Sequence, residues 1–160
     1  MIQIIDNFLP EEEFKSIQSI MMSDEFFWYY VLGCATTGKG EDGYHMTHTF
    51  FEPPQGPNSP HCDMWKPMMK RIKISEVMRI KANMILKTPE PFYSHYHSDN
   101  IGEKTGLLYI NTNNGYTEFE NGVIVNSVAN RYLSFDTYSI HRGVTCTDEM
   151  RRVVVNFNYS

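Results

Sequence analysis

Three side chains that could bind a single metal ion occur in the second half of the chain. His97 and Asp99 are separated by one residue, and His141 follows much later. Because residues i and i+2 of a β-strand point to the same side, His97 and Asp99 can reach one ion without a bend in the backbone. His141 would then come from the end of a second strand. Two imidazoles and one carboxylate leave the opposite side of a metal open for a bidentate co-substrate and O2, as in non-haem Fe(II) sites.

A pair of arginines begins the last apolar run of the chain and could bind an anion. A guanidinium binds a carboxylate through two parallel hydrogen bonds, and the pleat of a strand lets only one of two neighbours point inward. Arg151 shares its side of the strand with apolar residues, namely Val153, Val155 and Phe157. Arg152 shares its side with Asn156 and Asn158, which is typical of a solvated face. The pattern therefore favours Arg151 over Arg152 as the inward-pointing residue.

These residues belong to a larger set that resembles the 2-oxoglutarate/Fe(II) dioxygenase superfamily, in its prolyl-hydroxylase-like branch. The set consists of His97–Asp99, Tyr109–Gly115, His141 with Arg142 and Gly143, and the closing stretch 151–159. The opening stretch 6–10 also fits, so the resemblance covers nearly the whole chain. It extends in particular to the small single-domain members carried by marine tailed phages.

The resemblance implies an activity and a role for each candidate residue. His97, Asp99 and His141 would bind Fe(II), and Arg151 with Tyr109 would bind the far carboxylate of 2-oxoglutarate. O2 would be the second co-substrate, with ascorbate as a candidate reductant. The implied reaction is hydroxylation of a prolyl or other side chain in a peptide or protein substrate.

Two other functions remain open from the residues alone. A cupin-type metal isomerase shares the jelly-roll fold, and His95 and His97 followed by Glu103 resemble its ligand cluster, although Glu103 is one residue too far along. A non-catalytic peptide-binding barrel is the second alternative. In a regular strand, His95 would lie on the same side as His97 and Asp99. It would then either line the substrate entrance or be a structural histidine whose ring nitrogens are hydrogen-bonded within the fold.

Bulk properties indicate an ordinary globular protein. The 160 residues are 41% hydrophobic and 14% aromatic, which predicts a single domain over 1–160 with a real core. The net charge of −5 argues against generic nucleic-acid binding. No apolar run approaches the roughly 20 residues that a membrane span needs. Three unpatterned cysteines indicate free thiols in a reducing compartment, so we expect a cytoplasmic location, the host cytoplasm if a phage encodes the protein.

The hydrophobic pattern predicts a mainly β protein with flanking helices, a double-stranded β-helix (jelly-roll) barrel. One helix is expected after Pro10, with Phe14, Ile17, Ile20 and Met21 on its apolar face. A second is expected from 59 to about 72, broken or kinked at Pro67. Loops are expected over 33–43 and 52–60. The expected strands are 3–5, 26–32, 44–51, 77–87, 92–99, 105–111, 115–120, 131–135 and 151–159.

Overall fold

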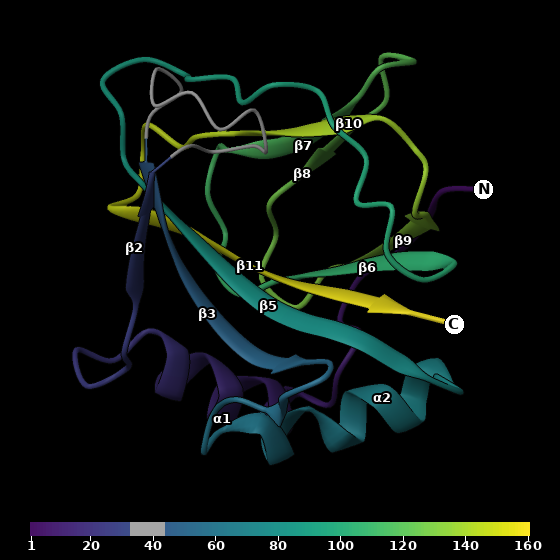
Figure 1. Cartoon of the computed structure of the whole chain (residues 1–160). Coiled ribbons are helices and arrows are strands. Elements are labelled where there is room, and N and C mark those ends of the chain that lie inside the picture. Colours follow the sequence, from purple (N-terminus) through teal and green to yellow (C-terminus); the bar gives the residue numbers. More distant parts are fainter. Residues whose placement is uncertain (33–43) are drawn as a thin grey trace.

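Two antiparallel β-sheets face each other in the computed structural model, which describes residues 1–32 and 44–160 (Figure 1). The large sheet has eight strands in the order β1-β9-β6-β11-β5-β3-β2, with β4 paired to β3, and the small sheet has the order β10-β7-β8. The strands are β1 (Gln3–Ile5), β2 (Tyr29–Leu32), β3 (Tyr44–Glu52), β4 (Gly56–Pro57), β5 (Val77–Leu86), β6 (Lys104–Tyr109), β7 (Tyr116–Phe119), β8 (Ile124–Asn126), β9 (Tyr132–Asp136), β10 (His141–Val144) and β11 (Arg151–Tyr159).

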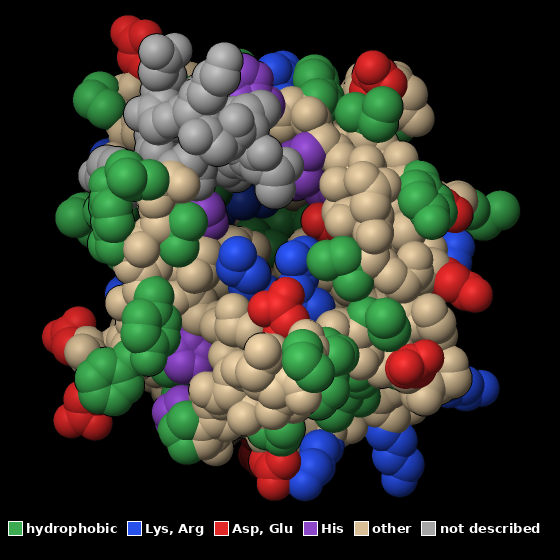
Figure 2. All heavy atoms as spheres, viewed as in Figure 1, with side chains coloured by type: hydrophobic (Ala, Val, Ile, Leu, Met, Phe, Trp, Pro, Cys, Tyr) green, Lys and Arg blue, Asp and Glu red, His purple; other side chains and the backbone are tan. Residues whose placement is uncertain are grey.

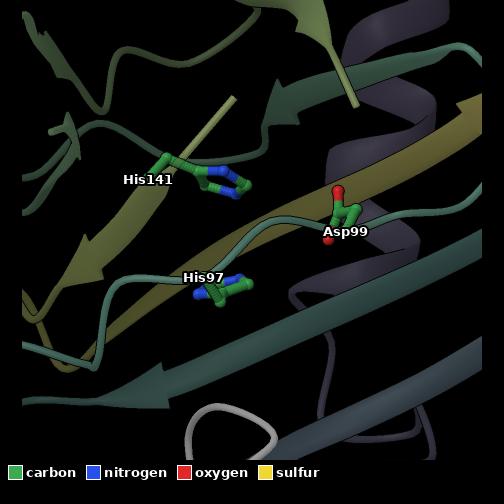
Figure 3. A group of neighbouring side chains, drawn as sticks. All are labelled: His97, Asp99 and His141. Carbon is green, nitrogen blue, oxygen red and sulfur yellow. The ribbon is translucent and has the colours of Figure 1, made fainter. Parts of the chain in front are cut away.

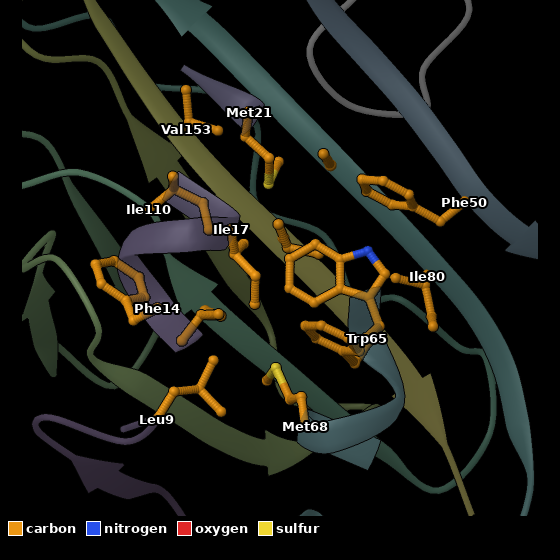
Figure 4. Packing of buried hydrophobic residues seen from close by; sticks show 14 of the residues in the cluster. Leu9, Phe14, Ile17, Met21, Phe50, Trp65, Met68, Ile80, Ile110 and Val153 are labelled. Atoms are coloured by element: carbon orange, nitrogen blue, oxygen red, sulfur yellow. The ribbon is translucent and has the colours of Figure 1, made fainter. Parts of the chain in front are cut away.

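Helices α1 (Glu11–Met21) and α2 (Lys66–Ile72) cover the outer face of the large sheet (Figure 1). Helix α1 begins after Pro10 with three glutamates, which suit the positive end of the helix. Of its predicted apolar face, Phe14, Ile17 and Met21 are buried and Ile20 is half-buried against the same core. Trp65, which ends a 3-10 turn (Cys62–Trp65) before α2, is fully buried against this face (Figure 4). Full burial of a large apolar side chain contributes about 1.5–3 kcal/mol, so this layer fixes the sheet firmly.

A second apolar cluster fills the space between the two sheets. Its members come from both sheets: Leu107, Tyr109, Phe119, Val125, Leu133, Phe135 and Val154. Strands β6 and β11 are therefore covered on both faces. The two sheets with this interior form the predicted mainly β jelly roll with flanking helices.

The alternation of β5 and β11 turns one polar side toward this interior. On β5, Ile80, Ala82 and Met84 join the cluster beneath the helices, while Arg79 and Lys81 point the other way. The register pairs Arg79 with Asn158, Lys81 with Asn156, and Ile85 with Arg152. The half-exposed strand predicted over 77–87 is present, but its polar side faces the interior of the barrel and not open solvent.

Several predicted elements differ in the structure. The stretch 92–99 is not a continuous strand, because it pairs only at two isolated bridges, Tyr93 with Val144 and His97 with His141. The helix predicted over 59–72 is divided into the 3-10 turn and α2. Pro67 lies in the first turn of α2, where its missing N–H costs nothing. The stretch 52–60 is irregular apart from β4. The loop predicted over 33–43 lies outside the described residues.

Two of the three cysteines, Cys62 and Cys146, are free thiols, as expected, and Cys34 lies outside the described residues. Within the described ranges, neither helix is long and apolar enough to cross a membrane.

Candidate metal and anion site

His97, Asp99 and His141 converge on one point inside the rim of the barrel (Figure 3). One ligand atom from each lies within 4.8 Å of the other two. His141 is the first residue of β10, and His97 lies on the bridge opposite it. Their backbones exchange two hydrogen bonds of 2.9 Å, N–H of each to the carbonyl of the other. This reciprocal pair fixes the distance between the two imidazoles.

The two imidazoles are oriented by backbone carbonyls. Nδ1 of His97 lies 3.1 Å from the His95 carbonyl, and Nδ1 of His141 lies 2.9 Å from the Ser139 carbonyl. With the proton on Nδ1, Nε2 of each ring is left as the metal-binding atom, an arrangement usual for histidine ligands. Burial lowers the pKa of His141, which favours the neutral form that a metal requires.

Asp99 is held in its charged form by three donors on one oxygen. Its Oδ2 accepts hydrogen bonds from Thr105 Oγ1 at 2.8 Å and from Nδ2 of Asn156 and Asn158 at 3.1 Å each. Burial alone would raise the pKa of Asp99, but these hydrogen bonds outweigh it and the pKa is lowered. Oδ1 remains as the ligand atom, with Arg79 Nη2 3.8 Å away. Two neutral imidazoles and one oriented carboxylate fit a divalent transition metal.

Strand β11 turns Arg152 into the interior, which corrects the prediction that Arg151 would point inward. Arg152 is 4% exposed and donates from Nε to Ser127 Oγ at 2.8 Å and from Nη2 to Thr117 Oγ1 at 3.1 Å. Arg151 points to the helix side, where its guanidinium donates to the Met22 carbonyl at the end of α1. The parity argument was wrong because both faces of β11 are buried. The apolar face packs under the helices, and the polar face lines the barrel.

Tyr109 lies in the same interior cluster as Arg152. Its hydroxyl donates to Thr117 Oγ1 at 2.8 Å, and the Arg152 guanidinium carbon lies 5.6 Å from its ring centroid. Thr117 faces Gly143 across the small sheet, two residues from the pair formed by Phe119 and His141. Two residues of strand span about 7 Å, so the Arg152 cluster lies one short ligand length from the metal ligands.

No carboxylate pairs with Arg152 among the residues that the structure describes. Burial also lowers the pKa of Arg152, because the charged guanidinium loses contact with water there. A buried cation without an acidic neighbour is costly, because the attraction that offsets its desolvation is missing. The cluster of Arg152, Thr117 and Tyr109 is therefore suited to an incoming carboxylate.

The same architecture occurs in solved oxygenase structures. A prolyl-4-hydroxylase from Pseudomonas putida matches with a TM-score of 0.63 at 14% identity, covering 99% of this chain and 92% of that one. A 2OG-Fe(II) oxygenase family oxidoreductase from Burkholderia pseudomallei matches with a TM-score of 0.73 at 12% identity, covering 99% and 84%. A prolyl hydroxylase from Trichoplax adhaerens, solved with a hypoxia-inducible-factor peptide fragment, matches with a TM-score of 0.69 at 14% identity. The match covers 99% of this chain and 83% of that one.

This chain has the fold of the prolyl hydroxylases. No family model and no curated protein matches its sequence. The likeness therefore concerns architecture, and the chemistry must be argued from the site.

Arg142, which the sequence analysis included only in the resembling segment after His141, holds the segment that carries His97 against β10. Its guanidinium lies 4.5 Å from the ring centroid of Tyr93 and 4.3 Å from that of Tyr96, and it forms a 2.7 Å ion pair with Glu118. Because His97 belongs to no continuous strand, this clamp adds to the few backbone bonds that hold it.

The remaining histidines are not part of the metal-ligand cluster. His95 and Glu103 are exposed, and the cluster within the described residues consists of His97, Asp99 and His141. His48 is buried, with its ring nitrogens 2.7 Å from the Phe27 carbonyl and from a serine hydroxyl. The arrangement expected of a cupin-type cluster through Glu103 is therefore not formed.

Proposed function

We propose that this chain is an Fe(II)- and 2-oxoglutarate-dependent hydroxylase, with residues 1–160 acting as one dioxygenase domain. The observation that carries the proposal is the convergence of His97, Asp99 and His141 within 4.8 Å. Their arrangement leaves one side of a bound ion free, which a co-substrate and O2 both need. The fold shared with 2OG-Fe(II) oxygenases supports the same conclusion.

The metal-binding roles follow from the hydrogen bonds around each ligand. His97 and His141 bind the ion through Nε2, and Asp99 binds it through Oδ1. When bound, Fe(II) supplies the activation of O2 coupled to oxidation of 2-oxoglutarate, and the protein supplies the geometry.

The co-substrate's far carboxylate binds to Arg152, with Thr117 and Tyr109 completing the anion site. The resemblance implied this role for Arg151. We assign it to Arg152 instead, because Arg152 is the arginine on the interior face of β11. The Tyr109 hydroxyl has a single donor, which points to Thr117. Rotation of this O–H would direct the hydrogen bond to the carboxylate instead. The fork of Arg152 then orients the rest of the molecule toward the metal.

Apolar side chains keep this part of the site dry. The rings of Phe135 and Phe119 lie 4.8 Å and 5.9 Å from the His141 ring, centroid to centroid. Excluding water from the inner side of the metal strengthens the charge interactions there and protects a reactive oxidant from side reactions.

The proposed substrate is a prolyl or other side chain of a peptide or protein. A fold neighbour from Trichoplax adhaerens was solved with a peptide fragment, which supports a peptide substrate. Ascorbate is proposed as the reductant that restores Fe(II) after uncoupled turnover.

Release of succinate and CO2 from 2-oxoglutarate, with and without Fe(II), tests the proposal. We expect iron-dependent release from the wild-type protein and none from His141→Ala. His95→Ala is the matched control, because His95 is exposed and lies beside a ligand without being one, and it should keep the activity. A loss in His95→Ala equal to that in His141→Ala would favour the cupin-type cluster, and a wild-type protein without release would favour a binding barrel.

A further inference from the structure

Two cations lie beside Asp99 on the interior side of β5, away from the Arg152 cluster. Arg79 donates from Nε to Asn158 Oδ1 at 3.1 Å and places Nη2 3.8 Å from Asp99 Oδ1. Lys81 follows two residues later on the same side of the strand, opposite Asn156. Figure 2 shows a hollow in this face of the molecule, where basic, histidine and acidic side chains meet at the rim.

Lys81 is half-buried and has no hydrogen-bond or ion-pair partner among the described residues. Burial, followed by the charge of Arg79, lowers the pKa of Lys81, while Glu52 and Asp99 act in the opposite direction. Glu52 is exposed at the end of β3, and a metal-bound Asp99 has its charge already matched. The local charge is thus left in excess on the positive side.

A polar acceptor in the same place also lacks a partner. Oδ1 of Asn156 is buried, and no donor reaches it within the described part of the chain. Its Nδ2 is committed to Asp99. A site that offers an ammonium, a guanidinium edge and a bare amide oxygen is complementary to a ligand with an anionic oxygen and a neighbouring N–H or O–H.

Lys81 and Arg152 lie at different levels of the paired strands β5 and β11. The two residues occupy register positions four residues apart along β11, since Lys81 pairs with Asn156 and Ile85 with Arg152. Four residues of strand span about 13 Å, which separates the backbones of the two positions. Lys81 and Arg79 therefore form a second group of cations, which shares no contact with the Arg152 cluster.

We propose that the substrate carries an anionic group, a carboxylate or a phosphate, which Lys81 and Arg79 bind beside the metal ligands. The inference rests on the proposed hydroxylase function and narrows its substrate class. The anion would hold the carbon to be oxidised on the open side of the metal, a few bonds from the charged group. Arg79 is already oriented by Asn158, so Lys81 supplies the adjustable contact.

Binding of small probes to a non-reacting complex tests the anion site. The protein is saturated with Zn²⁺, which supports no turnover, and with 2-oxoglutarate, which fills the Arg152 cluster. Calorimetric titrations then compare N-acetyl-L-proline, inorganic phosphate and the neutral N-acetyl-L-prolinamide. We expect at least one anionic probe to bind about tenfold more tightly than the amide, which corresponds to about 1.4 kcal/mol. The anionic probe that binds more tightly identifies whether the anionic group of the substrate is a carboxylate or a phosphate.

Variants of Lys81 locate the site. Lys81→Met should remove the preference for the anionic probe and leave binding of the amide unchanged, and Lys81→Arg should restore most of it. Lys70→Met is the matched control, because Lys70 is exposed on α2 at the outer face of the sheet. Equal affinity for anion and amide in the wild type, or an anion preference that survives Lys81→Met, would overturn the inference.

Failure of the hydroxylase proposal would give a different result. In that case the wild type releases no succinate with Fe(II), while the Lys81-dependent preference for anions persists. Succinate release without that preference keeps the hydroxylase and rejects the charged substrate.

Discussion

Replacing each of the two neighbouring arginines of β11 in turn distinguishes the role of the interior face of this strand from the role of the face beneath the helices. Arg152→Met removes a buried guanidinium that binds Thr117 and Ser127. Arg151→Met removes a guanidinium that binds the Met22 carbonyl at the end of α1. Both substitutions replace a long flexible cation with an apolar side chain of similar length, so they differ mainly in which face they alter.

The expected effects on co-substrate binding and on stability run in opposite directions. Loss of one partner of a buried charge pair costs about 2–5 kcal/mol, which weakens 2-oxoglutarate binding by roughly 30-fold to several thousandfold in Arg152→Met. Stability of that variant without ligand should change little or rise, because replacing a buried unmatched charge by an apolar group is often neutral or stabilising. Arg151→Met should lose about 1 kcal/mol of unfolding free energy with its hydrogen bond and bind 2-oxoglutarate normally.

Two measurements decide between these outcomes. Calorimetric titration of 2-oxoglutarate into the Zn²⁺-loaded proteins gives the binding constants, and thermal unfolding without ligand gives the stabilities. Normal 2-oxoglutarate binding by Arg152→Met together with weak binding by Arg151→Met would refute the assignment of the anion site. A large loss of stability in Arg152→Met would show that its charge is matched within the fold.

Three further substitutions test the supports of the metal site and the acid response. Asn158→Leu removes one of the three donors to Asp99 and should weaken metal binding about 10–100-fold in competition with a chelator, and unchanged affinity would contradict that positioning role. Arg142→Leu removes two cation–π contacts and should cost about 1–2 kcal/mol of unfolding free energy, with Arg142→Lys intermediate; equal stabilities would show that the clamp contributes nothing. Burial lowers the pKa of His48, so the unfolded state binds its proton more tightly and stability falls as the pH drops below about 6.5. His48→Gln should lose less stability from about pH 7 to about pH 5, and an equal loss would exclude His48 as a source of the acid response.

Periodic patterns predicted the elements whose packing is local and one-sided. The spacing of four apolar residues predicted α1. Phe14, Ile17 and Met21 are buried against the sheet, and Ile20 is half-buried. Alternation predicted β5 over nearly its full length, including which side of the strand is apolar. Such patterns are readable from sequence because one face of each element meets a core and the other a polar environment.

Short or irregular stretches were not predicted correctly, because their pairing comes from distant residues. The stretch 92–99 was predicted as a strand but pairs only at two isolated bridges to β10. The small sheet includes β8 (Ile124–Asn126) and β10 (His141–Val144), too short for a periodic signal. The donors to Asp99 come from β6 and β11, and the sequence around Asp99 does not predict them.

The sequence alone determined which residue types could form a metal site, since the i, i+2 spacing of His97 and Asp99 is a local property of an extended backbone. Only the tertiary structure decided which of Arg151 and Arg152 faces that site. The polar side of β11 looked solvated because polar residues usually meet water, yet here they meet a barrel interior. What covers each face of a strand depends on the rest of the chain, so parity within the strand could not settle it.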